Sequence, residues 1–135
     1  MALLEKQLKI KRSQIPGAGK GLFTTKPIAK GERIVEYKGK LTTWKEVNHR
    51  DGTNGYIFHI TRNRVIDAWS YPKAFGRYAN DARGLAKIKG LKNNADYVVD
   101  GGRAYIDATR NIEKGEEILV GYGKEYWDVI KQNAQ

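Results

Sequence analysis

The sequence contains no cysteine and only two histidines, His49 and His59. Without cysteine there are no disulfides, thiolate zinc sites, iron–sulfur clusters or cysteine nucleophile. With so few histidines we expect neither a Ser–His–Asp triad nor a histidine metal site, and we predict no metal site at all. The sequence also has no apolar run long enough to cross a bilayer, so we expect no membrane partner.

The first residues, MALLEKQLKIKR, lack the long apolar region and the small-residue cleavage site of a secretion signal. We therefore expect an intracellular protein. A bacterial cytoplasm is the first interpretation, and a nucleus or a host cell are the alternatives.

Positive charge is in excess, with 25 Lys and Arg against 15 Asp and Glu and a formal net charge of +10. Such a field favours acidic partners, which include nucleic acid, an anionic membrane surface and the acidic face of a protein. The net charge does not choose among them. Solubility alone explains a basic surface equally well.

The chain of 135 residues has the size of one domain, 1–135. Turn residues recur about every 8–12 residues between short apolar runs, which favours a mostly β fold with few short helices. We expect strands at 8–12, 33–38, 56–60, 65–68 and 118–120, and a hairpin over 97–108 with its tip at 100–102. Thr43 and Glu46 have the spacing of a capping box, which predicts a short helix there. A terminal helix is expected over 125–132.

Two segments of the chain echo each other, TTKPIAKGERIVEYKG at 24–39 and ATRNIEKGEEILVGYG at 108–123. Each reads as a strand, a Lys-Gly-Glu turn, a second strand and a glycine. We interpret the echo as two similar hairpins that use the same turn chemistry, with Gly31 and Gly115 at a position of positive φ.

Five short motifs occur in a fixed order: SQIPGAGKGLF at 13–23, EYKG at 36–39, RYAND at 77–81, NNADY at 93–97 and GEEILVGYG at 115–123. Together they resemble the SET domain, a family of S-adenosylmethionine-dependent protein lysine methyltransferases, over about residues 8–123. The short form is most similar to minimal bacterial or viral SET proteins. The resemblance implies a SET fold of several small sheets, with a knot-like crossing where 77–97 meets 115–123. A short aromatic segment, 124–135, would follow.

The resemblance also implies which residues would bind S-adenosylmethionine. They are Gly19, Lys20, Gly21, Arg77, Tyr78, Asn80, Asp81 and Trp127. Gly19, Lys20 and Gly21 would act chiefly through their backbone groups. Asn80 matches the asparagine of the family that contacts the cofactor.

Tyrosines would carry the transfer step. The resemblance casts Tyr122 and Tyr97 as the catalytic residues and places Tyr126 at the substrate channel. Tyr37 and Tyr105 are further aromatic residues that we assign to that channel. An aromatic channel suits a lysine side chain, because it buries the methylene stem and tolerates the charged end through cation–π contact. A tyrosine hydroxyl can orient the amine by hydrogen bonding. Taken singly, each of these tyrosines also fits a half-buried strand position.

The sequence departs from the family at one motif. Asp81 and Ala82 stand where the family has histidine and serine, and a basic insertion, 83–92, separates Asn80 from Asn94. We expect a protein-lysine N-methyltransferase whose protein substrate presents an exposed lysine and is acidic or nucleic-acid-associated. The alternative is a non-catalytic SET-like module that binds nucleic acid or a nucleic-acid-associated protein. The oligomeric state stays open, with a homodimer as one alternative.

Overall fold

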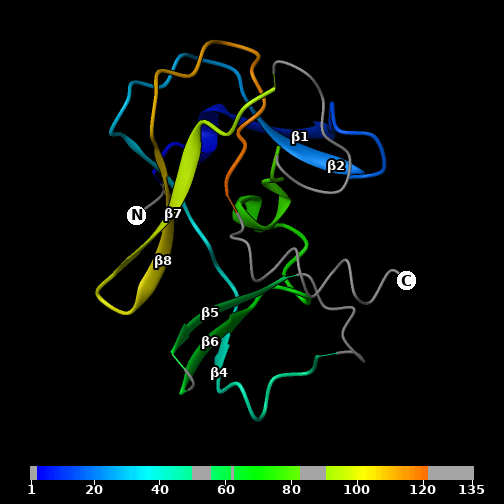
Figure 1. Ribbon diagram of the computed structural model, residues 1–135, viewed down its shortest axis with the longest axis vertical. Coiled ribbons are helices and arrows are strands. Elements are labelled where there is room, and N and C mark those ends of the chain that lie inside the picture. The colour runs from blue at the N-terminus through cyan, green and yellow to red at the C-terminus, as the bar shows by residue number, and fades with distance from the viewer. Residues whose placement is uncertain (1–2, 50–55, 62, 83–90, 122–135) are drawn as a thin grey trace.

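The computed structural model describes residues 3–49, 56–61, 63–82 and 91–121 (Figure 1). Two short 3₁₀ helices and eight strands follow one another in these ranges. In chain order they are η1 (Glu5–Gln7), β1 (Leu8–Arg12), β2 (Lys20–Thr24), β3 (Arg33–Glu36), β4 (Lys40–Thr42), β5 (Ile57–Thr61), β6 (Arg64–Asp67), η3 (Phe75–Tyr78), β7 (Ala95–Asp100) and β8 (Arg103–Ala108).

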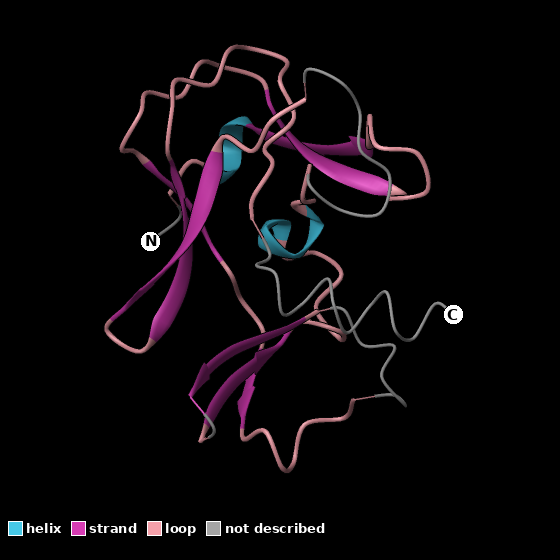
Figure 2. Ribbon diagram, in the orientation of Figure 1, coloured by secondary structure: helices cyan, strands magenta, loops and turns pink. Residues whose placement is uncertain are grey.

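The strands form three small antiparallel sheets, with the orders β1–β2, β3–β8–β7 and β4–β6–β5. Figure 2 shows that strands and loops dominate and that the helical turns are short. The expected fold class, a mostly β chain of several small sheets with few short helices, is therefore confirmed.

Local predictions had mixed outcomes. Strand β1 spans the residues expected for it, and the β7–β8 hairpin turns at Gly101 and Gly102, whose φ angles are 60° and 76°. Strands β2 and β4 were not predicted. Within 118–120, Leu119 and Val120 make isolated bridges instead of a continuous strand. The helix expected over 125–132 lies outside the described residues.

The short helix expected at Thr43 is wrong. The amide of Glu46 does donate to the Thr43 hydroxyl oxygen at 3.2 Å, as a capping residue requires. Residues 44–46 form only a turn, closed by the amide of Val47 on the Thr43 carbonyl at 2.9 Å. One hydrogen-bonded turn does not offset the entropy of helix nucleation, and the chain does not continue it.

The two echoing segments lie side by side, and their connecting loops run together at the top of Figure 1. Ile28 and Ile112 exchange two backbone hydrogen bonds of 2.8 Å each. Two further hydrogen bonds on either side are also equivalent to each other. The Gly31 amide donates to the Ala108 carbonyl and the Gly115 amide donates to the Thr24 carbonyl, both at 2.8 Å. Because equivalent residues exchange partners, the two segments meet around a local two-fold axis. Gly31 and Gly115 have φ angles of 91° and 86°, as the shared turn chemistry predicts.

The main core lies between the β1–β2 and β3–β8–β7 sheets. Its fully buried side chains include Leu22, Ile28, Ile34, Ile106, Ile112, Ile118 and Val120. A second cluster of Tyr37, Ile66, Ala68 and Ala104 packs under the β4–β6–β5 sheet. Tyr97 contacts both clusters, so it joins the two parts of the core.

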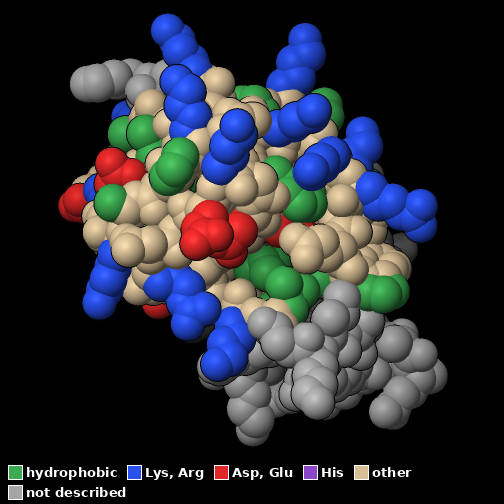
Figure 3. Space-filling view, turned by 90° about the horizontal axis from the view of Figure 1, so that it is seen from above, with side chains coloured by type: hydrophobic (Ala, Val, Ile, Leu, Met, Phe, Trp, Pro, Cys, Tyr) green, Lys and Arg blue, Asp and Glu red, His purple; other side chains and the backbone are tan. Residues whose placement is uncertain are grey.

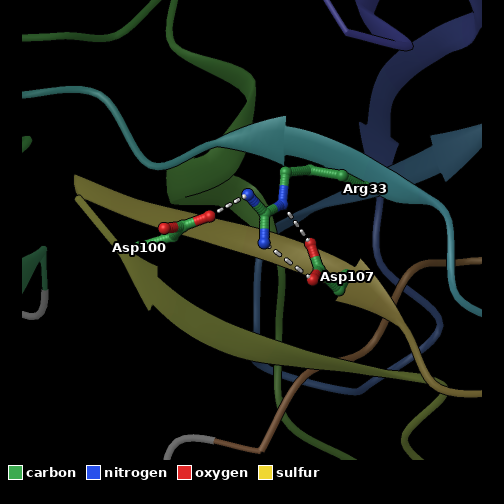
Figure 4. Close-up of polar contacts among 3 residues, drawn as sticks. All are labelled: Arg33, Asp100 and Asp107. Carbon is green, nitrogen blue, oxygen red and sulfur yellow. Dashed lines mark hydrogen bonds and ion pairs between the residues drawn. The ribbon is translucent and has the colours of Figure 1, made fainter.

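An ion-paired clamp secures the outer face of the β3–β8–β7 sheet (Figure 4). Arg33 on β3 donates to both oxygens of Asp107 on β8, at 2.9 and 3.2 Å, and to Asp100 on β7 at 3.0 Å. Hydrogen bonds to Asp107 first and Asp100 second raise the pKa of Arg33. The guanidinium also lies 4.3 Å from the ring centre of Tyr105. All three strands of this sheet are therefore linked through one side chain.

Residues 117–120 pass between two distant parts of the chain, which is the crossing that the resemblance to the SET domain implies. The amide of Val120 donates to the Asn80 carbonyl at 2.8 Å, and the amides of Asn94 and Ala95 donate to the Leu119 carbonyl at 2.9 and 3.1 Å. The Asn94 side chain, only 3% exposed, completes the crossing. Its amide group donates to the Glu117 carbonyl and its oxygen accepts from the Leu119 amide, each at 2.9 Å.

No helix in the described part of the chain is long and apolar enough to cross a membrane.

Replacing Asn94 with alanine should destabilise the protein by about 2–5 kcal/mol, because it leaves two buried backbone groups without partners. Urea denaturation would measure the change. The matched control is Asn111→Ala, which removes one exposed hydrogen bond to the Lys30 amide and should cost less than about 1 kcal/mol. Equal losses in the two variants would contradict a special role for Asn94 at the crossing.

Candidate functional site

The crossing brings Asn80 to the glycine-rich start of β2. The side-chain amide of Asn80 donates to the Lys20 carbonyl at 3.0 Å. Gly19, one residue earlier, has a φ of +72°, and among the described residues other than its chain neighbours no heavy atom lies within 4 Å of the position where its Cβ would stand. Three of the predicted cofactor residues, Gly19, Lys20 and Asn80, are thus neighbours, and open space adjoins the backbone of Gly19.

A buried carboxylate, Glu117, lies beneath this turn and is 2% exposed. One of its oxygens accepts from the Ser13 hydroxyl at 2.7 Å and from the Asn80 amide group at 3.3 Å, and the other accepts from the Gln14 backbone amide at 3.0 Å. Both oxygens of the side chain accept hydrogen bonds. No Lys or Arg within the described ranges pairs with Glu117.

Sequence reasoning did not assign Glu117 to the site. The sequence did contain an indication of its role. Glu117 directly precedes the apolar run Ile118–Val120 and is buried together with it. Buried charges are rare without hydrogen-bond partners. An acid at that place therefore predicts a set of donors around it.

Gly21 is required by this carboxylate. A Cβ at Gly21 would stand 2.3 Å from a side-chain oxygen of Glu117 and 3.1 Å from the Ser13 Cβ. Only glycine lets the carboxylate approach the β2 backbone this closely. The role of Gly21 in the structure is thus to admit Glu117, while its role in cofactor binding stays a prediction.

Asp81 is buried at the base of the insertion, 4% exposed. Its carboxylate accepts from the Asn93 side chain at 2.9 Å, and the oxygen of the same Asn93 side chain accepts from the Ala82 amide at 2.8 Å. Asn93 therefore ties together the two ends of the insertion. In this way Asp81 carries a structural contact where the family has histidine.

Arg77 and Tyr78 hold the segment that follows β6. Arg77 donates to the carbonyls of Ala68 and Trp69, both at 2.9 Å, and its guanidinium lies 4.0 Å from the ring centre of Tyr56. The Tyr78 hydroxyl donates to the Pro72 carbonyl. These contacts secure η3, from which the chain continues to Asn80. Direct cofactor contact by either side chain stays a prediction.

An aromatic group stands where the two clusters of the core meet. Tyr97 lies edge-on to Tyr37, with ring centres 5.9 Å apart, and 4.9 Å from Phe58. The Tyr37 hydroxyl donates to the Tyr56 carbonyl at 2.8 Å. Two predicted residues, Tyr37 and Tyr97, are thus in contact, and Phe58 is an additional member that sequence reasoning did not single out.

Tyr105 is not part of this group. In the β7–β8 register Tyr97 faces Ile106, and Tyr105 points to the other face of the sheet, where Arg33 covers it. Its placement follows from the two-residue period of the strand. The structure therefore does not bring Tyr105 together with Tyr37 and Tyr97. Three other predicted residues, Tyr122, Tyr126 and Trp127, lie outside the described residues.

A shallow hollow of about 320 Å³ lies on a different part of the surface, lined among others by Glu36, Tyr37, Leu41, Tyr71 and Arg103. Neither Asn80 nor Glu117 borders it. The hollow is therefore separate from the glycine-rich turn, and the site is defined by the hydrogen bonds at the crossing.

Comparisons with known proteins agree with this geometry. The family model of the SET domain matches residues 19–123. Histone-lysine N-methyltransferase ASHH3 of Arabidopsis thaliana is 33% identical over 123 residues, which cover 84% of this chain and 32% of the relative. N-lysine methyltransferase KMT5A-A of Danio rerio is 26% identical over 122 residues, 81% of this chain and 33% of the relative.

The solved methyltransferase domain of human PR domain-containing protein 2 has the same fold, with a TM-score of 0.64 and 24% identity over 90% of this chain and 82% of that domain. The chain belongs to the SET domain family. It spans about a third of the length of the two curated relatives.

Replacing Gly21 with alanine should destabilise the protein by about 1–3 kcal/mol, because the new methyl group meets the Glu117 carboxylate. Thermal or urea unfolding would measure this. Gly121→Ala is the matched control, since a Cβ there would meet its nearest atoms at 3.7 and 4.0 Å, which is ordinary contact. In a Glu117→Ala background the penalty of Gly21→Ala should shrink. An unchanged penalty in that background would show that the clash is not with Glu117.

Proposed function

We propose that this chain is an S-adenosylmethionine-dependent protein-lysine N-methyltransferase. The observation that carries the proposal is the crossing, which joins the glycine-rich start of β2, Asn80 and the buried Glu117 in one site. Membership of the SET domain family supports it, as do the names of relatives that act on histone or other protein lysines.

The residues present fit the cofactor. S-adenosylmethionine supplies a methyl group on a sulfonium cation, and the cofactor also carries an ammonium group. Open space at Gly19 allows a ligand to approach the backbone. The carboxylate of Glu117, without a cationic partner among the described residues, gives this place a negative potential that favours such a ligand.

The side chains of the site would act by positioning. Asn80 holds the Lys20 carbonyl, and Glu117 holds both Asn80 and the Gln14 amide, so the turn is fixed before a ligand arrives. Pre-set geometry of this kind can lower a transfer barrier by several kcal/mol.

The aromatic group would receive the substrate lysine. Tyr37, Phe58 and Tyr97 offer apolar ring surface for the methylene stem. The lysine amine would have to lose its proton to solvent before its lone pair could accept the methyl group that S-adenosylmethionine supplies. Tyr122 would orient the amine through its hydroxyl.

The substrate would be a protein with an exposed lysine, acidic or associated with nucleic acid, and the protein would work inside a cell. The excess of basic residues supports this partner, because a surface of net charge +10 repels an isolated basic tail.

The first experiment is calorimetric titration of the full chain with S-adenosylmethionine, beside Asn80→Ala. We expect micromolar binding that becomes at least about tenfold weaker in the variant, since Asn80 fixes the glycine-rich turn. Asn111→Ala, an exposed asparagine away from the site, should bind as the parent does. Absence of binding at millimolar cofactor would refute the cofactor-dependent function.

Methyl transfer itself is tested with tritium-labelled S-adenosylmethionine and a cell extract, followed by mass spectrometry of labelled lysines. Tyr122→Phe should lower turnover by at least about tenfold with cofactor binding unchanged, because it removes only the orienting hydroxyl. A Tyr122→Phe variant as active as the parent would exclude this role for Tyr122.

A further inference from the structure

The N-terminal part of the chain has a strongly one-sided charge. Residues 6–31 contain seven Lys and Arg and no Asp or Glu. The β1–β2 pair is formed within this stretch and exposes Lys9 and Lys11 on one face and Arg12 and Lys20 at the end of the other. We call these four residues on β1 and β2 the basic ribbon. Seen from above, most charged side chains on this side of the molecule are Lys and Arg (Figure 3).

The basic ribbon keeps like charges close together. Arg12 and Lys20 are directly opposite each other in the antiparallel register, an arrangement that destabilises a strand pair. Lys11 lies over the ring of Phe23 at 4.4 Å, which supports its stem and leaves the ammonium group exposed. None of the four cations has an ion-pair partner among the described residues. A bound polyanion would relieve the repulsion.

The acids nearest to this face do not neutralise the basic ribbon. Glu117 is buried beneath the ribbon and binds Ser13 and Gln14. Glu116 stands by the far end of β2, where its backbone carbonyl accepts from the Thr24 amide, and its side chain accepts from the Glu113 amide. The Lys9–Arg12 part of the ribbon therefore keeps its positive potential.

We propose that the basic ribbon binds the phosphate backbone of duplex nucleic acid. Large exposed hydrophobic side chains in the described ranges are Leu41, Trp44, Tyr71 and Val99, and none is on the ribbon. Tight protein interfaces are anchored by buried aromatic and apolar side chains, whereas phosphate contacts need only cations and polar groups.

This binding goes beyond the proposed methyl transfer and does not depend on it. Lys20, the first residue of β2, belongs both to the basic ribbon and to the candidate cofactor site, where its carbonyl accepts from Asn80. Nucleic acid held there would place the methyltransferase beside proteins bound to the same duplex. The ribbon would thus select substrates by their location.

Fluorescence anisotropy with a labelled DNA duplex of arbitrary sequence, without cofactor, tests the proposal on the full chain. The logarithm of affinity should fall with the logarithm of salt concentration with a slope of about −3 to −4 for four phosphate contacts. In Lys9→Gln/Lys11→Gln the slope should lose about 2, and affinity at about 50 mM salt should fall at least tenfold.

The matched control is Lys40→Gln/Lys45→Gln, which makes the same change in net charge at exposed positions on and after β4. It should stay within about twofold of the parent, because non-specific attraction by net charge alone is screened over about 10 Å at 0.1 M salt. Circular dichroism melting checks that both variants are folded. Equal loss in the two double variants would overturn the assignment to the ribbon, and so would failure of the parent to bind.

Further probes separate the ligand classes. A duplex of RNA in place of DNA identifies the preferred nucleic acid, and tighter binding of either one supports the proposal. Polyglutamate of the same total charge and phosphatidylserine vesicles should bind more weakly than the duplex. Tighter binding of polyglutamate or vesicles, lost in Lys9→Gln/Lys11→Gln, would assign the ribbon to another partner and overturn the proposal. Because no cofactor is present, a failure of methyl transfer leaves this result unaffected.

Discussion

The carboxamide of Asn94 joins two segments that are far apart in the chain, and the geometry of the candidate site follows from that junction. It pairs with the backbone on both sides of Ile118, at Glu117 and Leu119. An amide is suited to this task because one side chain supplies both a donor and an acceptor. Fixing residues 117–119 sets where the Glu117 side chain points, and Glu117 in turn holds Asn80. The site is therefore positioned from the core outward.

The local two-fold axis explains why the backbones of 24–39 and 108–123 are alike. It does not explain why side chains at equivalent positions have different roles. Arg33 pairs with Asp107 on β8, and at the equivalent place Glu117 pairs with Phe23 on β2. Both belong to the same kind of antiparallel contact. Arg33 secures the outer face of a sheet, whereas Glu117 is buried next to Gly21. The two segments therefore share their turns and backbone pairing. The side chain at the equivalent position decides the role, since Arg33 links the strands of a sheet at the surface and Glu117 forms part of the candidate site.

Much of the fold and part of the site could be predicted from the sequence. The order of short motifs pointed to a family whose fold contains the crossing, and residues 117–120 do meet Asn80 and Asn94. Strand β2 was missed because its glycines read as a turn, while its pairing with β1 is decided by tertiary contacts. Tyr105 was grouped with Tyr97 by residue type alone. The strand register separates them, and register depends on which face of a sheet is buried.

The start of β2 has opposite electrostatic preferences on its two sides. Inside, the carboxylate of Glu117 favours a cationic ligand, and outside, the side chains of Lys20 and Arg12 favour an anion. A basic protein substrate approaching a chain of net charge +10 meets repulsion that acts at long range. A duplex on the outer side would neutralise part of that charge and attract the same substrate. Nucleic acid binding would thus increase the local substrate concentration while the buried carboxylate stays shielded from solvent and salt.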